Sequence, residues 1–160
     1  MKQTVKHTVH ITEVIDAPVE KIWQIIRDFN GLPSFHPGIK ASRIEHGDGE
    51  SIGSIRHLTL ESGYVREELI LLDEKAHALD YVIIEGTLPV RNYSASVRLT
   101  FDADNSQTIC EWWADFDVVN AADRDGLIDL VGQHVFKVGF QSIARLCQAN
   151  SNLGAQRVAY

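Results

Sequence analysis

The sequence predicts an α+β domain in which a curved antiparallel sheet wraps around a long C-terminal helix. Between residues 39 and 119 the chain alternates short β-rich runs with turn residues and has no good helical period. One helical period precedes this region and a longer one follows it. The short connections favour an antiparallel meander, because parallel strands need long crossovers. A chain of 160 residues, 44% hydrophobic and 23% charged, is long enough for one such domain.

The N-terminal part is expected to form a strand and then an amphipathic helix. Residues 5–16 alternate β-branched with polar side chains, which is typical of a half-buried strand. Pro18 suits the first turn of a helix, and residues 18–29 carry apolar side chains at helical spacing. The sequence N-G-L-P at residues 30–33 ends this helix. Pro37 then limits the next segment to a short helical turn.

Six further strands and a final helix complete the prediction. The strands are expected at residues 39–46, 52–60, 64–72, 79–86, 90–102 and 108–118. Gly, Asp, Asn, Ser and Pro are frequent in the segments between them, as turns require. After residues 120–123 the apolar side chains follow a helical period to about Gln148. We expect a single domain at residues 1–150 and a flexible tail at residues 151–160.

Charge and composition exclude several classes of protein. The net charge of −7 and the lack of basic runs argue against a nucleic-acid partner. No apolar run is long enough for insertion into a membrane, and the N-terminus lacks the apolar region of a signal peptide. Cys110 and Cys147 do not form a disulfide framework, which favours a cytoplasmic location. His7 and His10 should point to opposite faces of a strand, so a metal site is not expected there. No cofactor is expected either.

Four polar residues fall on the apolar phases of the expected strands. They are Arg56, Glu67, Tyr81 and Tyr93. Alternate residues of a strand share a face, and Glu67 shares its face with valine and leucine, whereas both its sequence neighbours are charged. A carboxylate and two phenols on the inward face of one sheet predict a lined cavity rather than a dry core.

The spacing of one hairpin links two of these residues. A loop of either two or four residues between Leu58 and Val65 brings Arg56 directly opposite Glu67. A buried carboxylate needs such a partner, since an unpaired one is costly or shifts its pKa upward. The pair is either functional or a structural ion pair that fixes the register. Tyr81 and Tyr93, each taken alone, are also consistent with core residues whose hydroxyls reach a backbone group.

Several sequence segments carry a family resemblance. They are I-D-A-P-V-E-K-I-W at residues 15–23, D-F-N-G-L at 28–32, G-S-I-R at 53–56, E-E-L-I-L-L-D at 67–73 and L-P-V-R-N-Y at 88–93. Together they resemble the polyketide cyclase/dehydrase group of the START-like, birch-allergen-like superfamily, over roughly residues 8–147. The resemblance implies a helix-grip fold, in which a seven-stranded sheet grips a long C-terminal helix and encloses a hydrophobic cavity. The superfamily includes receptors, carriers and enzymes, so the motifs specify the fold better than the function.

Two groups within this superfamily imply roles for particular residues. Proteins like the lachrymatory-factor synthase line their catalytic pocket with residues that match Arg56, Glu67, Tyr81 and Tyr93. Receptors of the abscisic-acid type hold the polar groups of their ligand with residues that match Lys40, Glu67 and Tyr93.

Other positions depart from the receptor pattern or match it conditionally. Asp115 matches a ligand-binding glutamate of the receptors if the Trp113 side of its strand faces the cavity. The gate and latch of the receptors are replaced by S-G-Y-V at residues 62–65 and L-P-V at residues 88–90. A hormone-receptor gating role is therefore not expected. Phe35 and its neighbours in residues 32–37 are expected to flank the entrance of the cavity.

The leading hypothesis is a polyketide cyclase/dehydrase-like protein that binds a small hydrophobic ligand with a polar oxygen group. The expected ligand contacts are Lys40, Glu67, Tyr81, Tyr93, Asp115 and Phe35. One alternative is a cofactor-free lyase or isomerase, which catalyses dehydration, isomerisation or aldol-type cyclisation with Glu67 as acid or base and with Arg56 and Tyr93 assisting. Another is a START-like protein–protein adaptor that uses residues 32–36 as its contact surface. The sequence does not decide between a monomer and a dimer.

Overall fold

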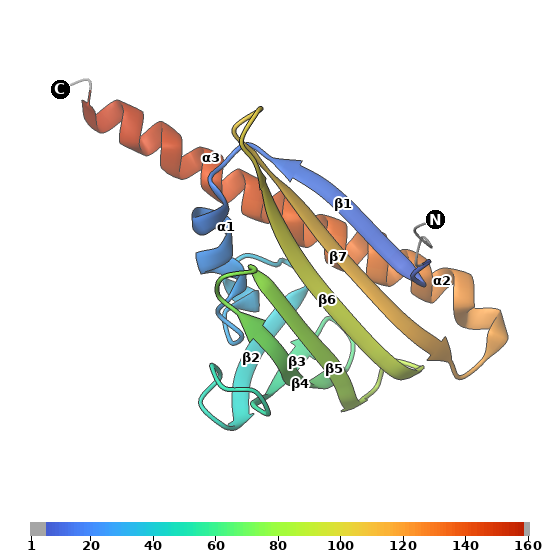
Figure 1. The fold of residues 1–160 in the computed structure, drawn as a ribbon. Helices are drawn as coiled ribbons and strands as arrows, with labels where there is room; N and C mark the ends of the chain where they lie inside the picture. The colour runs from blue at the N-terminus through green and yellow to red at the C-terminus, as the bar shows by residue number, and fades with distance from the viewer. Residues whose placement is uncertain (1–5, 159–160) are drawn as a thin grey trace.

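The computed structural model describes residues 6–158, with side chains described for residues 6–149. Within this range, seven strands form one antiparallel sheet in the order β1-β7-β6-β5-β4-β3-β2. A long helical segment follows the last strand and runs diagonally across one face of the sheet (Figure 1). The structure thus confirms the predicted α+β fold, with a curved antiparallel sheet around a long C-terminal helix.

Strands β2 to β7 form a meander. β1, the first strand of the chain, pairs with β7 and forms the edge of the sheet opposite β2. Their bounds are β1 (Val9–Ile15), β2 (Ile39–His46), β3 (Ile55–Leu60), β4 (Tyr64–Asp73), β5 (Ala78–Gly86), β6 (Val90–Asp102) and β7 (Gln107–Val118). The predicted limits of β2 and β6 are confirmed. β3 starts later than predicted, because Ser54 N donates to Ser51 O in a turn. Residue 5 of the first predicted strand lies outside the described residues.

The first helix, α1 (Val19–Ile26), is shorter than the prediction of residues 18–29. Pro18 is extended rather than helical, and the N–H of Arg27 donates to Trp23 O at the C-terminal end. The helix buries Ile22 and Trp23 completely. A single 3₁₀ turn, η1 (Leu32–Ser34), follows it and leads the chain to β2.

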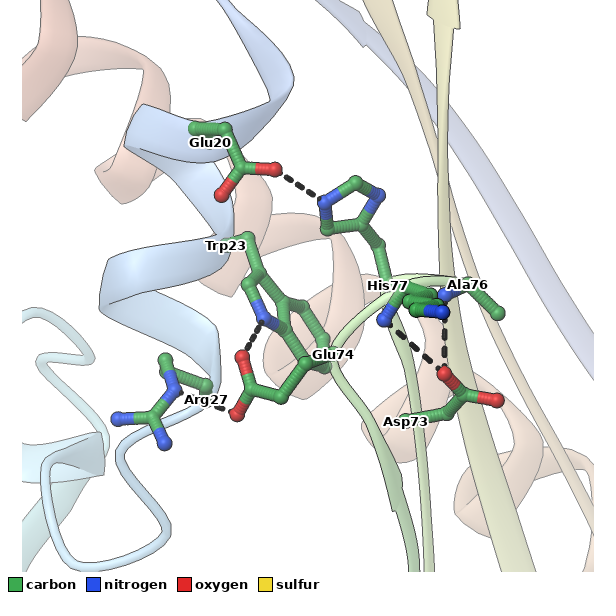
Figure 2. A network of polar contacts seen from close by, with 8 residues as sticks. Glu20, Trp23, Arg27, Asp73, Glu74, Ala76 and His77 are labelled. Carbon is green, nitrogen blue, oxygen red and sulfur yellow. Dashed lines mark hydrogen bonds and ion pairs between the residues drawn. The ribbon is translucent and has the colours of Figure 1, made fainter.

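A polar clamp fastens α1 to the turn between β4 and β5 (Figure 2). Glu74 accepts a hydrogen bond from the indole Nε1 of Trp23 and another from Nε of Arg27, both at 2.8 Å. These two bonds lower the pKa of Glu74. On the other side of the turn, His77 Nε2 lies 2.6 Å from Oε1 of Glu20. The clamp therefore fixes the position of α1 along the edge of the core.

The C-terminal helical segment has four parts in sequence. They are η2 (Ala121–Asp123), α2 (Arg124–Asp129), the π-helical η3 (Leu130–Lys137) and α3 (Val138–Val158). The sequence predicted a single helix to about residue 148, so the π-helical part is a departure from that prediction. The helix itself continues to Val158, while the predicted division into a domain at residues 1–150 and a flexible tail stays a prediction.

The hydrophobic core lies between the sheet and the helices. Its fully buried members include Trp23, Phe29, Leu69, Phe136, Phe140 and Ile143. Gly132 allows the helical segment to lie close to β1, since a Cβ atom at this position would be 3.1 Å from Cγ1 of Val9. No helix in the described part of the chain is both long and apolar enough to cross a membrane.

Candidate functional site

A cavity of about 330 Å³ lies between the sheet and the C-terminal helical segment. Its apolar wall includes Leu58, Val65, Ile83, Leu88, Trp112 and Val131. The polar side chains of its wall include His36, Glu67, Tyr81, Tyr93 and His134. A mainly apolar wall with a few polar groups is typical of small-molecule sites, whose volumes are about 300–1,000 Å³.

Arg56 and Glu67 form a buried ion pair beside this cavity. They lie directly opposite each other in the β3–β4 ladder, as the hairpin spacing predicts. Nε and Nη2 of Arg56 both donate to Oε1 of Glu67, at 2.9 and 2.7 Å. Nη1 donates to the carbonyl oxygen of Phe29 at 2.7 Å, and the guanidinium carbon lies 3.9 Å from the Phe29 ring centroid. Arg56 is thus held from several sides and directs its charge at one carboxylate oxygen.

The second carboxylate oxygen of Glu67 has a different environment. Both bonds from Arg56 end on Oε1, and no donor among the described residues reaches Oε2. Glu67 is 5% exposed and forms part of the cavity wall, so Oε2 is the oxygen that a ligand can meet. Burial raises the pKa of Glu67, and the Arg56 charge and hydrogen bonds oppose this rise. The carboxylate can accept a hydrogen bond or a proton at Oε2.

Tyr81 and Tyr93 place two phenols near the same carboxylate. Both are buried, and their ring centroids are 6.4 Å apart. The hydroxyl of Tyr81 accepts a hydrogen bond from Nε1 of Trp112 at 3.2 Å. Burial and then the neighbouring charges, including that of Glu67, raise the pKa of both tyrosines. Both hydroxyls therefore stay protonated at neutral pH and can donate hydrogen bonds.

Lys40 and Phe35 lie away from the wall of the main cavity. Nζ of Lys40 is 2.9 Å from Oε2 of Glu61 in an exposed ion pair, and Glu61 rather than Lys40 belongs to the cavity wall. Phe35 borders a separate void of about 30 Å³ that also contacts Arg56 and Tyr81. Its neighbours Leu32 and His36, from the same predicted entrance segment, do line the main cavity.

Asp115 lies on the outer face of the sheet. It accepts a hydrogen bond from the backbone N–H of Thr8 and lies 2.9 Å from Nδ1 of His7. The buried phase of β7 holds Trp112, Ala114 and Phe116, so the Trp113 side does not face the cavity and the condition for a ligand role of Asp115 is not met. The rings of His7 and His10 both pack against Trp113. The prediction that these histidines point to opposite faces is wrong, because His7 precedes β1. Among the residues that the structure describes, no cluster of three or more potential metal ligands occurs.

His36 was predicted only as part of the entrance segment, residues 32–37, and not as a site residue in its own right. It is 1% exposed, its Nδ1 accepts a hydrogen bond from Gly38 N, and its Nε2 donates to the carbonyl of Val135 at 2.8 Å. These two bonds assign the neutral tautomer with the proton on Nε2, and burial lowers the pKa of the ring. His36 thus ties the segment after η1 to the π-helical part of the cavity wall. A histidine between two prolines gave no periodic signal for this position.

Comparisons with known proteins agree with this geometry. The family model described as "Polyketide cyclase / dehydrase and lipid transport" matches residues 6–148. An abscisic acid receptor of Arabidopsis thaliana is 30% identical over 98 residues, which cover 59% of this chain and 53% of the receptor. The chain spans about half the length of the curated relatives it matches.

Solved structures share the fold at low sequence identity. A START superfamily protein from Mycobacterium smegmatis superimposes with a TM-score of 0.72 at 18% identity, covering 88% of this chain and 97% of that protein. A norcoclaurine synthase point mutant from Thalictrum flavum, solved with a transition state analogue, has a TM-score of 0.71 at 18% identity, covering 92% of this chain and 99% of the synthase. At this identity the similarity concerns the fold alone.

Proposed function

The chain belongs to the polyketide cyclase/dehydrase and lipid transport family, and on that premise we propose that it binds a small, largely apolar ligand whose oxygen group lies at Glu67. The observation that carries the proposal is the unpartnered Oε2 of this carboxylate in the cavity wall. A ligand hydroxyl can donate to Oε2, while the hydroxyl of Tyr93 can donate to the ligand oxygen. The abscisic acid receptor among the relatives, itself named for a small molecule, also supports a binding function.

A second candidate function, proton transfer by Glu67, is favoured by the pKa of this residue. Burial raises that pKa above its ordinary value, which brings it closer to the range in which a general base works near neutral pH. Arg56 acts as a positioning residue in this proposal, since its bonds to Glu67 and Phe29 orient the carboxylate. Tyr93 and Tyr81 would orient the substrate oxygen. The reaction class is then a dehydration, an isomerisation or an aldol-type cyclisation.

A matched pair of fluorescent ligands tests the binding proposal. 2-Naphthol carries a hydroxyl donor, and 2-methoxynaphthalene has the same rings without one. We expect 2-naphthol to bind about tenfold more tightly, because a hydrogen bond to a charged acceptor contributes roughly 1.5–3 kcal/mol. Glu67→Gln should remove most of this difference, since the amide can turn its NH₂ group toward the cavity. Glu68→Gln, at the half-buried neighbour in sequence, is the control and should leave it unchanged.

The results separate the two candidate functions. Equal affinity of the two ligands for the unmodified protein would contradict the placement of a ligand oxygen at Glu67. For each ligand that binds, mass spectrometry of long incubations detects any product. Turnover that Glu67→Gln abolishes, with binding retained, supports proton transfer by Glu67. Binding without any product supports a carrier or receptor role.

A further inference from the structure

Strands β5 and β6 separate before they reach their connecting turn. Their ladder runs from Ala78 opposite Arg98 to Val82 opposite Ser94, and no further pair between them occurs within the described residues. Both strands nevertheless continue, β5 to Gly86 and β6 back to Val90. A hairpin ordinarily pairs up to its turn. We call the gap between residues 83–86 and residues 90–93 the β5–β6 split.

The backbone of β6 changes course at the same level. The register between β6 and β7 shifts between Arg91 and Ser94. Asn92 has a φ of 53°, in the left-handed region, and its side chain donates to Asp117 on β7. Such a bulge bends one strand away from a neighbour and changes the direction of the side chains around it. The start of β6 is therefore fastened to β7 rather than to β5, which keeps the split open.

An open recess of about 670 Å³ occupies the β5–β6 split. The buried Tyr93 and the exposed Ser94 follow each other on β6, and both line the recess, as do the consecutive β5 residues Ile83 and Ile84. Since consecutive strand residues point to opposite faces, the recess lies in the plane of the sheet. Ile83, Leu88 and Tyr93 also line the main cavity. The recess and the cavity therefore share a wall and lie side by side.

The proposed oxygen site lies beside the recess. Ile83, which lines both spaces, is the direct ladder partner of Glu67. The recess wall contains further apolar side chains, namely Val82, Ile84 and Val90. The cavity alone, at about 330 Å³, lies at the small end of the ligand-site range of roughly 300–1,000 Å³. The wall also contains Glu85, Arg91, Asn92 and Ser94, so the recess is partly polar. A ligand larger than the cavity has this adjacent, partly apolar space to enter.

Resting on the proposed function, we propose that the β5–β6 split is a second subsite, which takes the alkyl or acyl chain of a ligand whose hydroxyl-bearing end lies at Glu67. The ligand class is then an elongated molecule with a compact oxygen-bearing head. Its chain leaves the cavity beside Ile83 and lies between the two strands. Among the described residues, the backbone groups that face the split have no partner in the β5–β6 ladder and can accommodate an amide or ester within the chain.

Two phenols with the same head and different chains test this subsite. 4-Ethylphenol fits within the cavity, whereas the chain of 4-octylphenol must extend from it. Affinities are measured by displacement of 2-naphthol from the protein. Ile84→Trp fills the split without changing a residue of the main cavity wall, and Ile70→Trp is the control, because Ile70 is equally exposed at 41% and lines neither space. Circular dichroism shows whether Ile84→Trp folds. If it does not, Val90→Trp serves as the second variant that fills the split.

We expect Ile84→Trp to weaken the binding of 4-octylphenol by about tenfold, because the tryptophan would leave roughly two methylenes of the chain in water. The affinity for 4-ethylphenol should stay unchanged, and Ile70→Trp should change neither affinity. If Ile84→Trp weakens the binding of both phenols equally, or of neither, the subsite is overturned. The proposed function still stands in that case, provided that 4-ethylphenol binds the unmodified protein. Failure of both phenols to bind the unmodified protein overturns the proposed function and the subsite with it.

Discussion

The substitution Arg56→Met should destabilise the protein in a manner that depends on pH. Methionine keeps an apolar stem in place but removes the guanidinium. The lost contacts are the two hydrogen bonds to Oε1 of Glu67, the bond to the Phe29 carbonyl and the stacking on the Phe29 ring. Arg56 and Glu67 are each 5% exposed, so water replaces few of these contacts. The variant therefore leaves a buried carboxylate and a buried carbonyl without their donors.

At pH 7 we expect Arg56→Met to lower the free energy of unfolding by about 4 kcal/mol, since removal of one partner of a buried ion pair costs roughly 3–5 kcal/mol. Arg56 is also the group that lowers the pKa of Glu67 against the effect of burial. Without it, the folded-state pKa rises further above the unfolded value of about 4.3. As pH rises above the unfolded value, the unfolded chain loses its proton while the folded protein retains it. Stability therefore falls with rising pH, and the cost shrinks on acidification.

Urea unfolding at pH 5 and pH 7.5 measures this cost for the parent, Arg56→Met and the double variant Arg56→Met/Glu67→Leu. The double variant removes both charges and should recover most of the loss, because replacing a buried pair by apolar residues is often neutral or stabilising. A cost for Arg56→Met below about 1 kcal/mol at both pH values, as for a surface ion pair, would refute the reasoning. So would a double variant as unstable as the single one.

Three further predictions concern the core and its polar supports. Leu69→Ala should cost about 2–5 kcal/mol in urea unfolding, because Leu69 is fully buried; a smaller loss would mean that the site collapses around the alanine. Glu74→Ala should lower the free energy of unfolding by about 0.5–1.5 kcal/mol, because it removes the hydrogen bond from the indole N–H of Trp23 to a carboxylate that water can partly replace; the exposed Lys75→Ala is the control, and an equal loss there would contradict the clamp. Burial lowers the pKa of His36 in the folded protein. As the pH decreases below the unfolded value of about 6.5, the unfolded chain therefore takes up a proton first, and the free energy of unfolding decreases by at most about 1.4 kcal/mol per pH unit. His36→Asn should flatten this dependence between pH 5 and 7, and an unchanged slope would exclude His36 as its source.

The strands could be predicted because their signals are local. Alternation of side chains and turn chemistry placed β2 and β6 at their observed limits, and hairpin spacing paired Arg56 with Glu67. The π-helical η3 gave no comparable signal. Its apolar residues fit an ordinary helical period. The wider turn depends on contacts with the sheet, and the sequence of the helix alone does not reveal those contacts.

The candidate site was predictable where one strand face settles the direction of a side chain. Glu67, Tyr81 and Tyr93 share apolar phases, and all three line the cavity. Asp115 is different, because tryptophans occur on both phases of β7. Trp112 is the core residue, stacked 4.4 Å from Phe136, a ring from the distant C-terminal helix. Only that contact between distant segments decides which face of β7 points inward.

The size of the cavity also limits what can occupy it. If each cubic ångström of empty apolar space costs about 24 cal/mol, a dry cavity of about 330 Å³ would cost roughly 8 kcal/mol, which is comparable to the whole stability of a domain. Water or a ligand must therefore fill it. Water can bond the polar groups such as Glu67 and Tyr93, but most of the wall is apolar, so a largely apolar ligand gains by displacing it. A ligand with a hydroxyl at Glu67 replaces the bonds that this water makes to the carboxylate, and selectivity for that group follows from the cost of leaving Oε2 unpaired.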